Sequence, residues 1–181
     1  MHVIFLSNDP LSSVVQDQET NRVLYEIETP FSVKVQTTTV RDARGQEVAF
    51  FKRGWTRDEV HVYGETRLVS DWLYKKKILS SSRRFDAPNG RTYSWKQGWS
   101  TSKFTLTDCE TEQVVAQSHG AKSGVFSSPS KMGIEVQDEV VPILDAILVS
   151  FIILEKRRID QLIASSSTQA ANSATVALAG A

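Results

Sequence analysis

Hydrophobic side chains are densest in one stretch near the C-terminus, residues 140–154 (VVPILDAILVSFIIL), and four charged residues (EKRR, 155–158) follow it directly. The apolar residues fall on every side of a helical wheel. A helix that is hydrophobic all round must be enclosed by protein or by lipid. After Leu154 the apolar positions become one-sided, so we predict a helix over about 139–163 that leaves its enclosure near Leu154.

Upstream of this stretch the hydrophobic pattern has a period of two instead of 3.6. Residues 22–29 (RVLYEIET) place Val23, Tyr25 and Ile27 on one side and polar residues mainly on the other, as in a half-buried strand. Similar segments between turn-forming residues predict further strands. The predicted set is 3–6, 12–15, 22–29, 32–40, 47–51, 59–63, 65–69, 83–85, 92–96, 104–107, 113–117 and 132–136.

About a dozen short strands at this spacing favour a barrel or a sandwich over a parallel sheet. Residues 71–79 are compatible with a strand or an irregular link, and residues 118–130 are the longest candidate loop. One domain of residues 1–164 is therefore expected, with a mainly β architecture around the C-terminal helix. Residues 165–181 are rich in Ser, Ala and Thr, and we predict a low-complexity, disordered tail there.

Length and charge favour protein over lipid as the surroundings of the apolar helix. A bilayer core needs roughly 20 apolar residues, more than residues 140–154 supply. Insertion would gain roughly 3 to 7 kcal/mol, and Asp145 would cost about 2.5 to 3.5 kcal/mol of that. Burial in a protein core is worth about 1.5 to 3 kcal/mol for each large side chain. We therefore predict a buried helix in which Asp145 has a structural role, bonded to the sheet or to the first-turn amides.

The overall charge excludes a general attraction to nucleic acid. The chain has 21 basic and 21 acidic residues, so any anionic ligand would need a local basic patch. The single cysteine, Cys109, cannot form an internal disulfide, which agrees with a reducing compartment. Residues 3–6 are too short for the apolar core of a secretion signal, so a cytoplasmic location is expected.

The densest basic region comprises Lys75, Lys76, Lys77, Arg83 and Arg84. If their strands pair, these cations can meet and hold a phosphorylated headgroup through charge-assisted hydrogen bonds. The alternative is a solvated edge, because lysines on edge strands also prevent aggregation between sheets.

No catalytic or metal-binding motif is evident. His2, His61 and His119 are scattered along the chain without metal-ligand spacing. Cys109 lies between Asp108 and Glu110, whose charges disfavour the thiolate that a nucleophile needs. The sequence thus predicts a protein that is not an enzyme and has neither a metal nor a cofactor.

Several motifs in order resemble a known family. They are IFLSNDPLSSVVQD (4–17), RVLYEIETPF (22–31), TTTVRD (37–42), RFDAPNGRTYSWK (84–96) and LDAILVSFIILEKRR (144–158). Together they look like an uncharacterised fungal domain-of-unknown-function family of the tubby C-terminal-like superfamily, which also contains LURP-one-related and phospholipid scramblase-like proteins. The resemblance implies a closed antiparallel β-barrel of about a dozen strands enclosing a hydrophobic C-terminal α-helix. It also implies lipid-linked relatives, since tubby domains bind phosphoinositide headgroups, but no tubby phosphate-binding motif aligns with this chain.

The expected function is a non-enzymatic binding module that docks on anionic membrane lipid, such as phosphoinositide headgroups, through a basic barrel surface. It would be cytoplasmic and peripheral at membranes, and nucleic acid is not an expected partner. The alternative is a protein-interaction or structural domain without lipid affinity and with a protein partner to be identified. A weaker alternative is a membrane-anchored protein that inserts the apolar helix. The sequence leaves the oligomeric state open.

Overall fold

The computed structural model describes residues 1–32, 35–54, 56–77, 80–98, 103–120, 122–124 and 127–179. Twelve strands form one antiparallel sheet, and two shorter strands form a separate hairpin. The strands of the large sheet are β1 (His2–Phe5), β2 (Ser13–Asp17), β3 (Val23–Glu28), β4 (Gln36–Asp42), β5 (Glu47–Arg53), β6 (Glu59–Val62), β7 (Glu65–Leu68), β8 (Arg83–Asp86), β9 (Thr92–Gln97), β10 (Phe104–Asp108), β11 (Val114–His119) and β14 (Gly133–Val136).

The remaining elements are two strands and three helical segments. The hairpin of β12 (Lys122–Gly124) and β13 (Ser127–Ser130) lies in the segment that we predicted to be the longest loop. A single helical turn, α1 (Val69–Trp72), follows β7 and begins inside the last predicted strand of that region. A 3-10 segment, η1 (Asp138–Ile143), then leads into the long helix α2 (Leu144–Ala179), so the helical region begins one residue before the predicted start at 139.

The order of the strands in the sheet follows the chain except at one place. The order is β7-β6-β5-β4-β3-β2-β1-β14-β11-β10-β9-β8, with every neighbouring pair antiparallel. Strands β1 to β7 form one meander and β8 to β11 another. Strand β14 joins the two meanders, because it pairs with β1 on one side and with β11 on the other.

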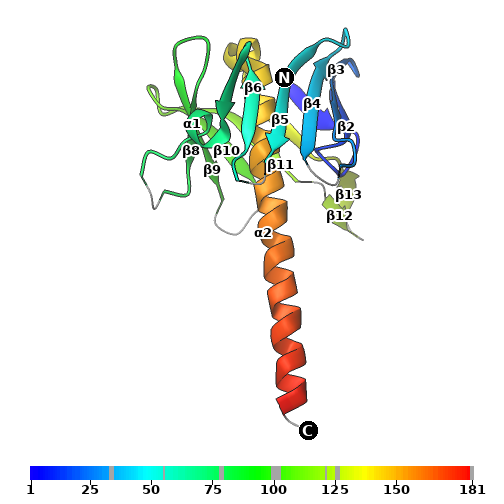
Figure 1. The fold of residues 1–181 in the computed structure, drawn as a ribbon. Coiled ribbons are helices and arrows are strands. Elements are labelled where there is room, and N and C mark those ends of the chain that lie inside the picture. Colours follow the sequence, from blue (N-terminus) through cyan, green and yellow to red (C-terminus); the bar gives the residue numbers. More distant parts are fainter. Residues whose placement is uncertain are drawn as a thin grey trace.

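The structure confirms the mainly β fold with a C-terminal helix but not a closed barrel. Among the described residues, the edge strands β7 and β8 share no hydrogen-bonded ladder, so hydrogen bonds do not close the sheet. Helix α1 and the segment after it connect these two edges, and Tyr74 forms an isolated antiparallel bridge with Arg84. Figure 1 shows α2 running through the assembly, with strands on either side of it.

The first three turns of α2 form the centre of the hydrophobic core, as predicted. From Ala146 to Glu155 every residue is buried, with Ala146, Ile147, Leu148 and Ile153 fully enclosed. Phe151 contacts the rings of Phe5, Trp95 and Phe104, which come from both halves of the sheet. Because the helix has no polar stripe here, the sheet must cover it on all sides.

A buried hydrogen bond fixes α2 against β9. Trp95 Nε1 donates to Ser150 Oγ at 2.8 Å, and Ser150 Oγ donates to the carbonyl oxygen of Ile147 at 3.0 Å. Both side chains are almost fully buried. Buried polar groups of this kind need a partner, so the bond sets the depth of the helix within the sheet.

The only charged side chain within the apolar stretch is also bonded to the sheet. Tyr25 Oη on β3 donates to Asp145 Oδ1 in the first turn of α2 at 2.5 Å. Burial and this bond raise the pKa of the Tyr25 hydroxyl above its usual range. The prediction that Asp145 has a structural role is confirmed.

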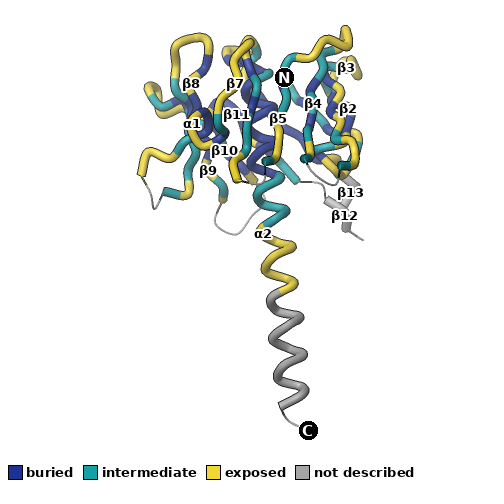
Figure 2. The backbone as a smooth tube through the Cα atoms, viewed as in Figure 1, coloured by how far each residue is buried: buried dark blue, intermediate teal, exposed yellow. Residues whose placement is uncertain are grey.

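Helix α2 leaves the sheet where the sequence predicted it would. Residues 156–160 are half-buried and residues 161–167 are exposed, a change that Figure 2 shows along the helix. The helix continues to Ala179, whereas we predicted disorder from Ser165 onward. Ala, Ser and Gln are compatible with a helix, and no Gly or Pro interrupts the segment before Gly180. In the described part of the chain, no helix is both long and apolar enough to span a membrane.

The Trp95–Ser150 bond generates a stability prediction. Replacing Ser150 by Ala leaves the buried indole N–H without an acceptor, so Ser150→Ala should lower the free energy of unfolding by about 1 to 3 kcal/mol. Urea unfolding followed by tryptophan fluorescence measures the change. The matched control is Ser166→Ala on the exposed part of α2, which should shift stability by less than about 0.5 kcal/mol. Equal losses in the two variants would contradict the assigned role of Ser150.

Candidate functional site

Strand alternation divides the predicted basic cluster between two faces of the sheet. Arg83 pairs with the buried Trp95 and lies on the core-facing side of β8, as Phe85 does. Arg84 pairs with Ser94 and lies on the opposite face. The cations therefore do not form one continuous patch.

Two of the predicted residues meet the end of the buried helix instead. Lys75 and Arg83 line a cavity of about 230 Å³ beside the point where α2 leaves the sheet, which we call the exit cavity. Arg157 and Arg158 of α2 line the same cavity. Uncharged polar side chains (Ser81, Gln97, Gln161) and apolar ones (Trp95, Phe104, Leu154) complete the lining. None of the described lining residues carries a carboxylate.

Arg83 is the least compensated cation of the exit cavity. It is half-buried, and within the described residues its guanidinium forms neither a hydrogen bond nor an ion pair. Burial and then the neighbouring charge of Arg157 lower the pKa of the Arg83 guanidinium from its usual value. Burial also lowers the pKa of Arg157, and Asp58 offsets part of that effect. Both guanidinium groups are thus partly dehydrated, and their like charges repel each other.

The other arginine of the helix end is firmly paired. Arg158 donates to both carboxylate oxygens of the buried Glu155, at 2.8 and 2.6 Å. Among the described residues, Arg157 has one long ion pair, with its Nη2 4.0 Å from Asp58 Oδ2. The cavity therefore contains a positioned arginine, Arg158, and two weakly compensated ones, Arg83 and Arg157.

A second group of ion pairs holds α2 at the exit. Asp160 bonds Lys156 one turn before it and Arg53 of β5, whose Nη2 lies 3.2 Å from Asp160 Oδ2. These pairs tie the helix to the sheet on the side of β5. They also satisfy Lys156 and Arg53, so neither cation competes for a ligand in the exit cavity.

This arrangement suits an anion with several oxygen atoms. A guanidinium presents its donors in a planar fork that matches a phosphate or carboxylate group, and charge-assisted hydrogen bonds are about twice as strong as neutral ones. The volume of about 230 Å³ and the polar lining fit a compact group such as one phosphate. Such a ligand would neutralise the repulsion between Arg83 and Arg157.

The other predicted site residues lie elsewhere. Lys77 is exposed, and Lys76 and Arg84 lie close enough to Cys109 to affect the pKa of its thiol. Burial is the main cause of the higher pKa of Cys109, so the thiol stays protonated, as its acidic neighbours led us to expect. Arg84 Nε is buried without a hydrogen-bond partner among the described atoms.

Sequence analysis missed Arg157 and Arg158 as site residues. The available signal was their position, directly after the last all-round apolar turn of the helix. A cation directly after a buried helical segment lies at the rim of the sheet that encloses the helix. The partner strand that brings Arg83 to the same rim could not be identified from the sequence.

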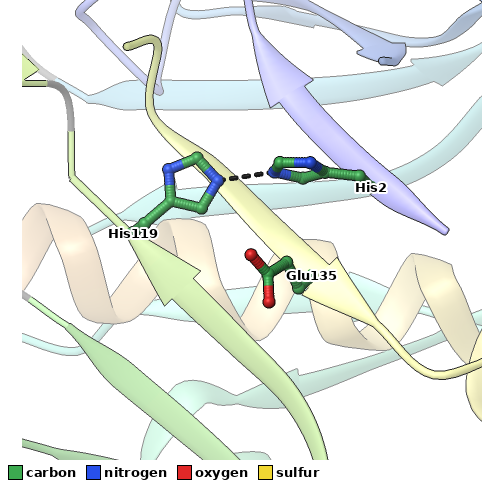
Figure 3. Close-up of side chains that lie close together, drawn as sticks. All are labelled: His2, His119 and Glu135. Carbon is green, nitrogen blue, oxygen red and sulfur yellow. Dashed lines mark hydrogen bonds between the residues drawn. The ribbon is translucent and has the colours of Figure 1, made fainter. Parts of the chain in front are cut away.

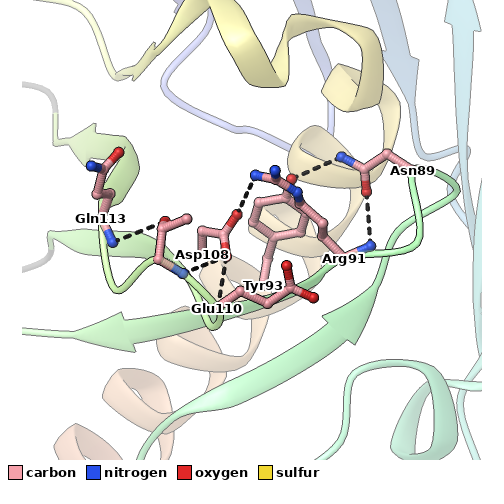
Figure 4. Close-up of polar contacts among 7 residues, drawn as sticks. Asn89, Arg91, Tyr93, Asp108, Glu110 and Gln113 are labelled. Carbon is pink, nitrogen blue, oxygen red and sulfur yellow. Dashed lines mark hydrogen bonds and ion pairs between the residues drawn. The ribbon is translucent and has the colours of Figure 1, made fainter.

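A separate polar network, drawn in Figure 4, stabilises the fold around the turn from β10 to β11. The buried Asp108 accepts hydrogen bonds from Arg91 Nη1 at 3.0 Å and from the backbone N–H groups of Glu110 and Thr111 at 2.8 and 3.2 Å. Nearby, Asn89 Nδ2 donates to the hydroxyl oxygen of Tyr93. Each of these contacts closes a turn or joins neighbouring strands, so we assign the network to stability and not to ligand binding.

Comparison with known proteins indicates a family and a fold. The profile of a family described as a family of unknown function, DUF6593, matches residues 8–160. The X-ray structure of a protein from Arabidopsis thaliana is similar, with a TM-score of 0.50 and 16% sequence identity over 83% of this chain and 88% of that one. At this identity the likeness concerns the fold alone. None of the curated proteins matches this chain.

Asp108 gives a prediction with a defined pH dependence. Burial raises the pKa of its carboxyl, but the N–H groups of Glu110 and Thr111 and the Arg91 guanidinium lower it by more, so the net pKa is lower than usual. Asp108→Asn should therefore lower the free energy of unfolding by about 2 kcal/mol at pH 7. Because the folded state holds the carboxylate, this difference is complete above about pH 4 and shrinks as the pH falls below it.

Urea unfolding at pH 7 and at pH 3 measures this difference. The control is Asp71→Asn, which changes an exposed carboxylate and should alter stability by less than about 0.5 kcal/mol. A destabilisation by Asp108→Asn that is equally large at both pH values would contradict the role of the carboxylate charge.

The two kinds of arginine in the exit cavity should respond oppositely to neutralisation. Arg83→Gln removes a like-charge contact, so stability should stay the same or rise by about 0.5 kcal/mol at low ionic strength, and added salt should reduce any gain. Arg158→Gln leaves Glu155 buried and unpaired, which should cost about 2 kcal/mol. Urea unfolding in low-salt and high-salt buffer distinguishes these outcomes. A loss of more than about 1 kcal/mol in Arg83→Gln would show that Arg83 is a structural residue.

Proposed function

We propose that this chain, which belongs to the DUF6593 family of unknown function, is a non-enzymatic module that binds the phosphorylated headgroup of an anionic membrane lipid in the exit cavity. Lys75, Arg83 and Arg157 supply the charge, and Arg158, held by Glu155, supplies a positioned donor at the rim. The protein would then be cytoplasmic and peripheral at membranes.

One observation carries this proposal. The half-buried Arg83 has no hydrogen-bond or ion-pair partner among the described residues, and it shares its cavity with a second poorly compensated arginine, Arg157. A half-buried charge has lost part of its hydration, and without a partner nothing in the protein replaces that hydration. A cavity that keeps two such cations close together is a site where an anion gains binding energy.

The surroundings of the exit cavity favour a lipid as the source of the phosphate. Leu162 and Ile163, one turn beyond Arg158, are 54% and 62% exposed. Residues 161–181 contain no Asp, Glu, Lys or Arg. Cations followed by exposed apolar side chains on a helix match the boundary between headgroups and acyl chains.

The family resemblance also supports a lipid ligand. We propose that this family belongs to the tubby C-terminal-like superfamily, on the motifs quoted above and on the large antiparallel sheet around a buried helix. Relatives of that superfamily are linked to membranes. The phosphate would here be held by residues of this chain's own exit cavity, since no binding motif is carried over.

A protein-interaction domain is the second candidate, because exposed Leu162 and Ile163 could equally contact an apolar groove of a partner protein. This candidate needs no anion in the exit cavity. The weaker alternative, anchoring by insertion of the apolar helix, has little support, since residues 146–155 are already enclosed by the sheet.

Co-sedimentation with liposomes tests the lipid proposal. The protein should bind vesicles of phosphatidylcholine that contain a phosphoinositide, more weakly at physiological than at low salt, and should not bind phosphatidylcholine alone. The double variant Arg83→Gln/Arg157→Gln should bind about 30-fold more weakly, because each cation near an anionic surface contributes about 1 kcal/mol. Arg22→Gln/Arg44→Gln, at two exposed arginines in the turns that precede β3 and β5, is the control that removes the same charge elsewhere.

Two further arms distinguish the sources of the anion. In the first arm, soluble inorganic phosphate raises the melting temperature of the native protein but not that of the double variant, and the native protein does not bind vesicles. This result would identify the ligand as a free anion and not a lipid. Equal vesicle binding by Arg83→Gln/Arg157→Gln and by Arg22→Gln/Arg44→Gln would remove the exit cavity from the proposal. A native protein that binds neither vesicles nor phosphate would leave the protein-interaction domain as the better candidate.

A further inference from the structure

Two histidines that are 117 positions apart in the sequence meet on the outer face of the sheet. His2 Nε2 of β1 and His119 Nε2 of β11 lie 2.6 Å apart, and their rings are arranged edge to face. The carboxylate of Glu135, on β14 between those strands, points toward the same place (Figure 3). One ligand atom from each of the three residues lies within 4.8 Å of the others.

The central strands of the sheet bring the members of this cluster together. His2 is the register partner of Glu135 across β1 and β14, and His119 is the partner of Gly133 across β14 and β11. Side chains two positions apart on a strand share a face, so Glu135 and the space above Gly133 adjoin. His119 reaches diagonally over β14 into that space. All three strands are paired on both sides, which gives the cluster a rigid backbone.

Gly133 makes the diagonal approach possible. A Cβ atom at this position would lie 2.7 Å from His119 Nε2 and 2.5 Å from the carbonyl oxygen of Val3. Any other residue would displace the His119 ring from its place beside His2. The glycine therefore leaves the room in which the two Nε2 atoms converge.

We propose that His2, His119 and Glu135 bind a divalent transition-metal ion of the Zn²⁺ class. Two imidazole nitrogens and one carboxylate oxygen are a donor set that Zn²⁺ takes with tetrahedral geometry, the fourth position being left to water. The two nitrogens would move apart to about 3.3 Å, the separation set by Zn–N bonds of about 2.0 to 2.1 Å.

The hydrogen bond between His2 and His119 in the metal-free protein is compatible with metal binding. At 2.6 Å one ring carries its proton on Nε2 and donates it to the Nε2 lone pair of the other. Binding of a metal through both Nε2 atoms requires the tautomer of each ring that carries its proton on Nδ1. The Glu135 carboxylate supplies negative charge to the site.

The cluster is open to solvent through a neighbouring cavity. A cavity of about 330 Å³ borders His2 and Glu135, and Glu19 and Gln117 line it as well. The carboxylate of Glu19 adds negative charge along the route by which a cation would enter. None of the lining residues belongs to the exit cavity, so metal binding stands independently of the proposed lipid site.

Titration calorimetry with ZnCl₂ on the full chain, prepared without a polyhistidine tag, tests the proposal. The native protein should bind one Zn²⁺, and Co²⁺ in its place should show the visible absorption bands of tetrahedral coordination. His119→Gln and Glu135→Gln should each weaken Zn²⁺ binding by about 100-fold or more, beyond the loss seen when groups around a metal's ligands are changed. Urea unfolding checks that both variants are folded, and either one alone is sufficient for the test.

His61→Gln is the matched control. His61 lies on β6, where its Nδ1 atom is 2.9 Å from Thr66 Oγ1, and its replacement should leave Zn²⁺ binding unchanged. The proposal is overturned if the native protein binds Zn²⁺ no more tightly than the millimolar range. It is also overturned if His61→Gln weakens binding as much as His119→Gln, or if folded His119→Gln and Glu135→Gln bind as the native protein does.

Discussion

Enclosure of an α-helix that lacks a polar stripe is the constraint on which this structure depends. From Ala146 to Glu155 the helix buries every side chain, so strands have to surround it. That requirement explains why two meanders, joined through β14, contribute aromatic rings to the same Phe151. It also explains why the polar groups inside, Ser150 and Asp145, are both bonded to strands.

The same enclosure brings positively charged side chains together at the point where the helix leaves the sheet. Where α2 leaves the sheet, cations that follow the apolar stretch come close to Arg83, which the pleat of β8 directs toward the interior. Part of the positive charge at this boundary is compensated by the carboxylates of Glu155, Asp58 and Asp160. The Arg83 guanidinium has no hydrogen-bond or ion-pair partner among the described residues. A stability-optimised boundary would carry a carboxylate in this place, so the imbalance is the feature that points to a ligand.

The sequence predicted what depends on local periodicity and did not predict what depends on strand pairing. The period of two in residues 22–29 and the all-round apolar pattern of residues 140–154 correctly predicted strands and a buried helix. Lys75, Lys76 and Lys77 looked like one patch because they are consecutive, but Arg83 and Arg84 face opposite sides of the sheet. His2 and His119 looked scattered, and only the registers of β1, β14 and β11 bring them together. Neighbours in space that are distant in sequence have no local signature.

The pairing of β1 with β14 has a consequence for how the protein is made. The backbone N–H of Val136 donates to the carbonyl oxygen of Met1, 135 positions away, at 2.9 Å. During translation the first meander therefore stays incomplete until β14 and then α2 have been synthesised. Until then one edge of β1 is unpaired and the apolar face of the meander is uncovered. Native contacts of such high contact order form slowly, and unpaired strand edges invite association. The nascent chain should accordingly depend on chaperones until the helix arrives to fill its core.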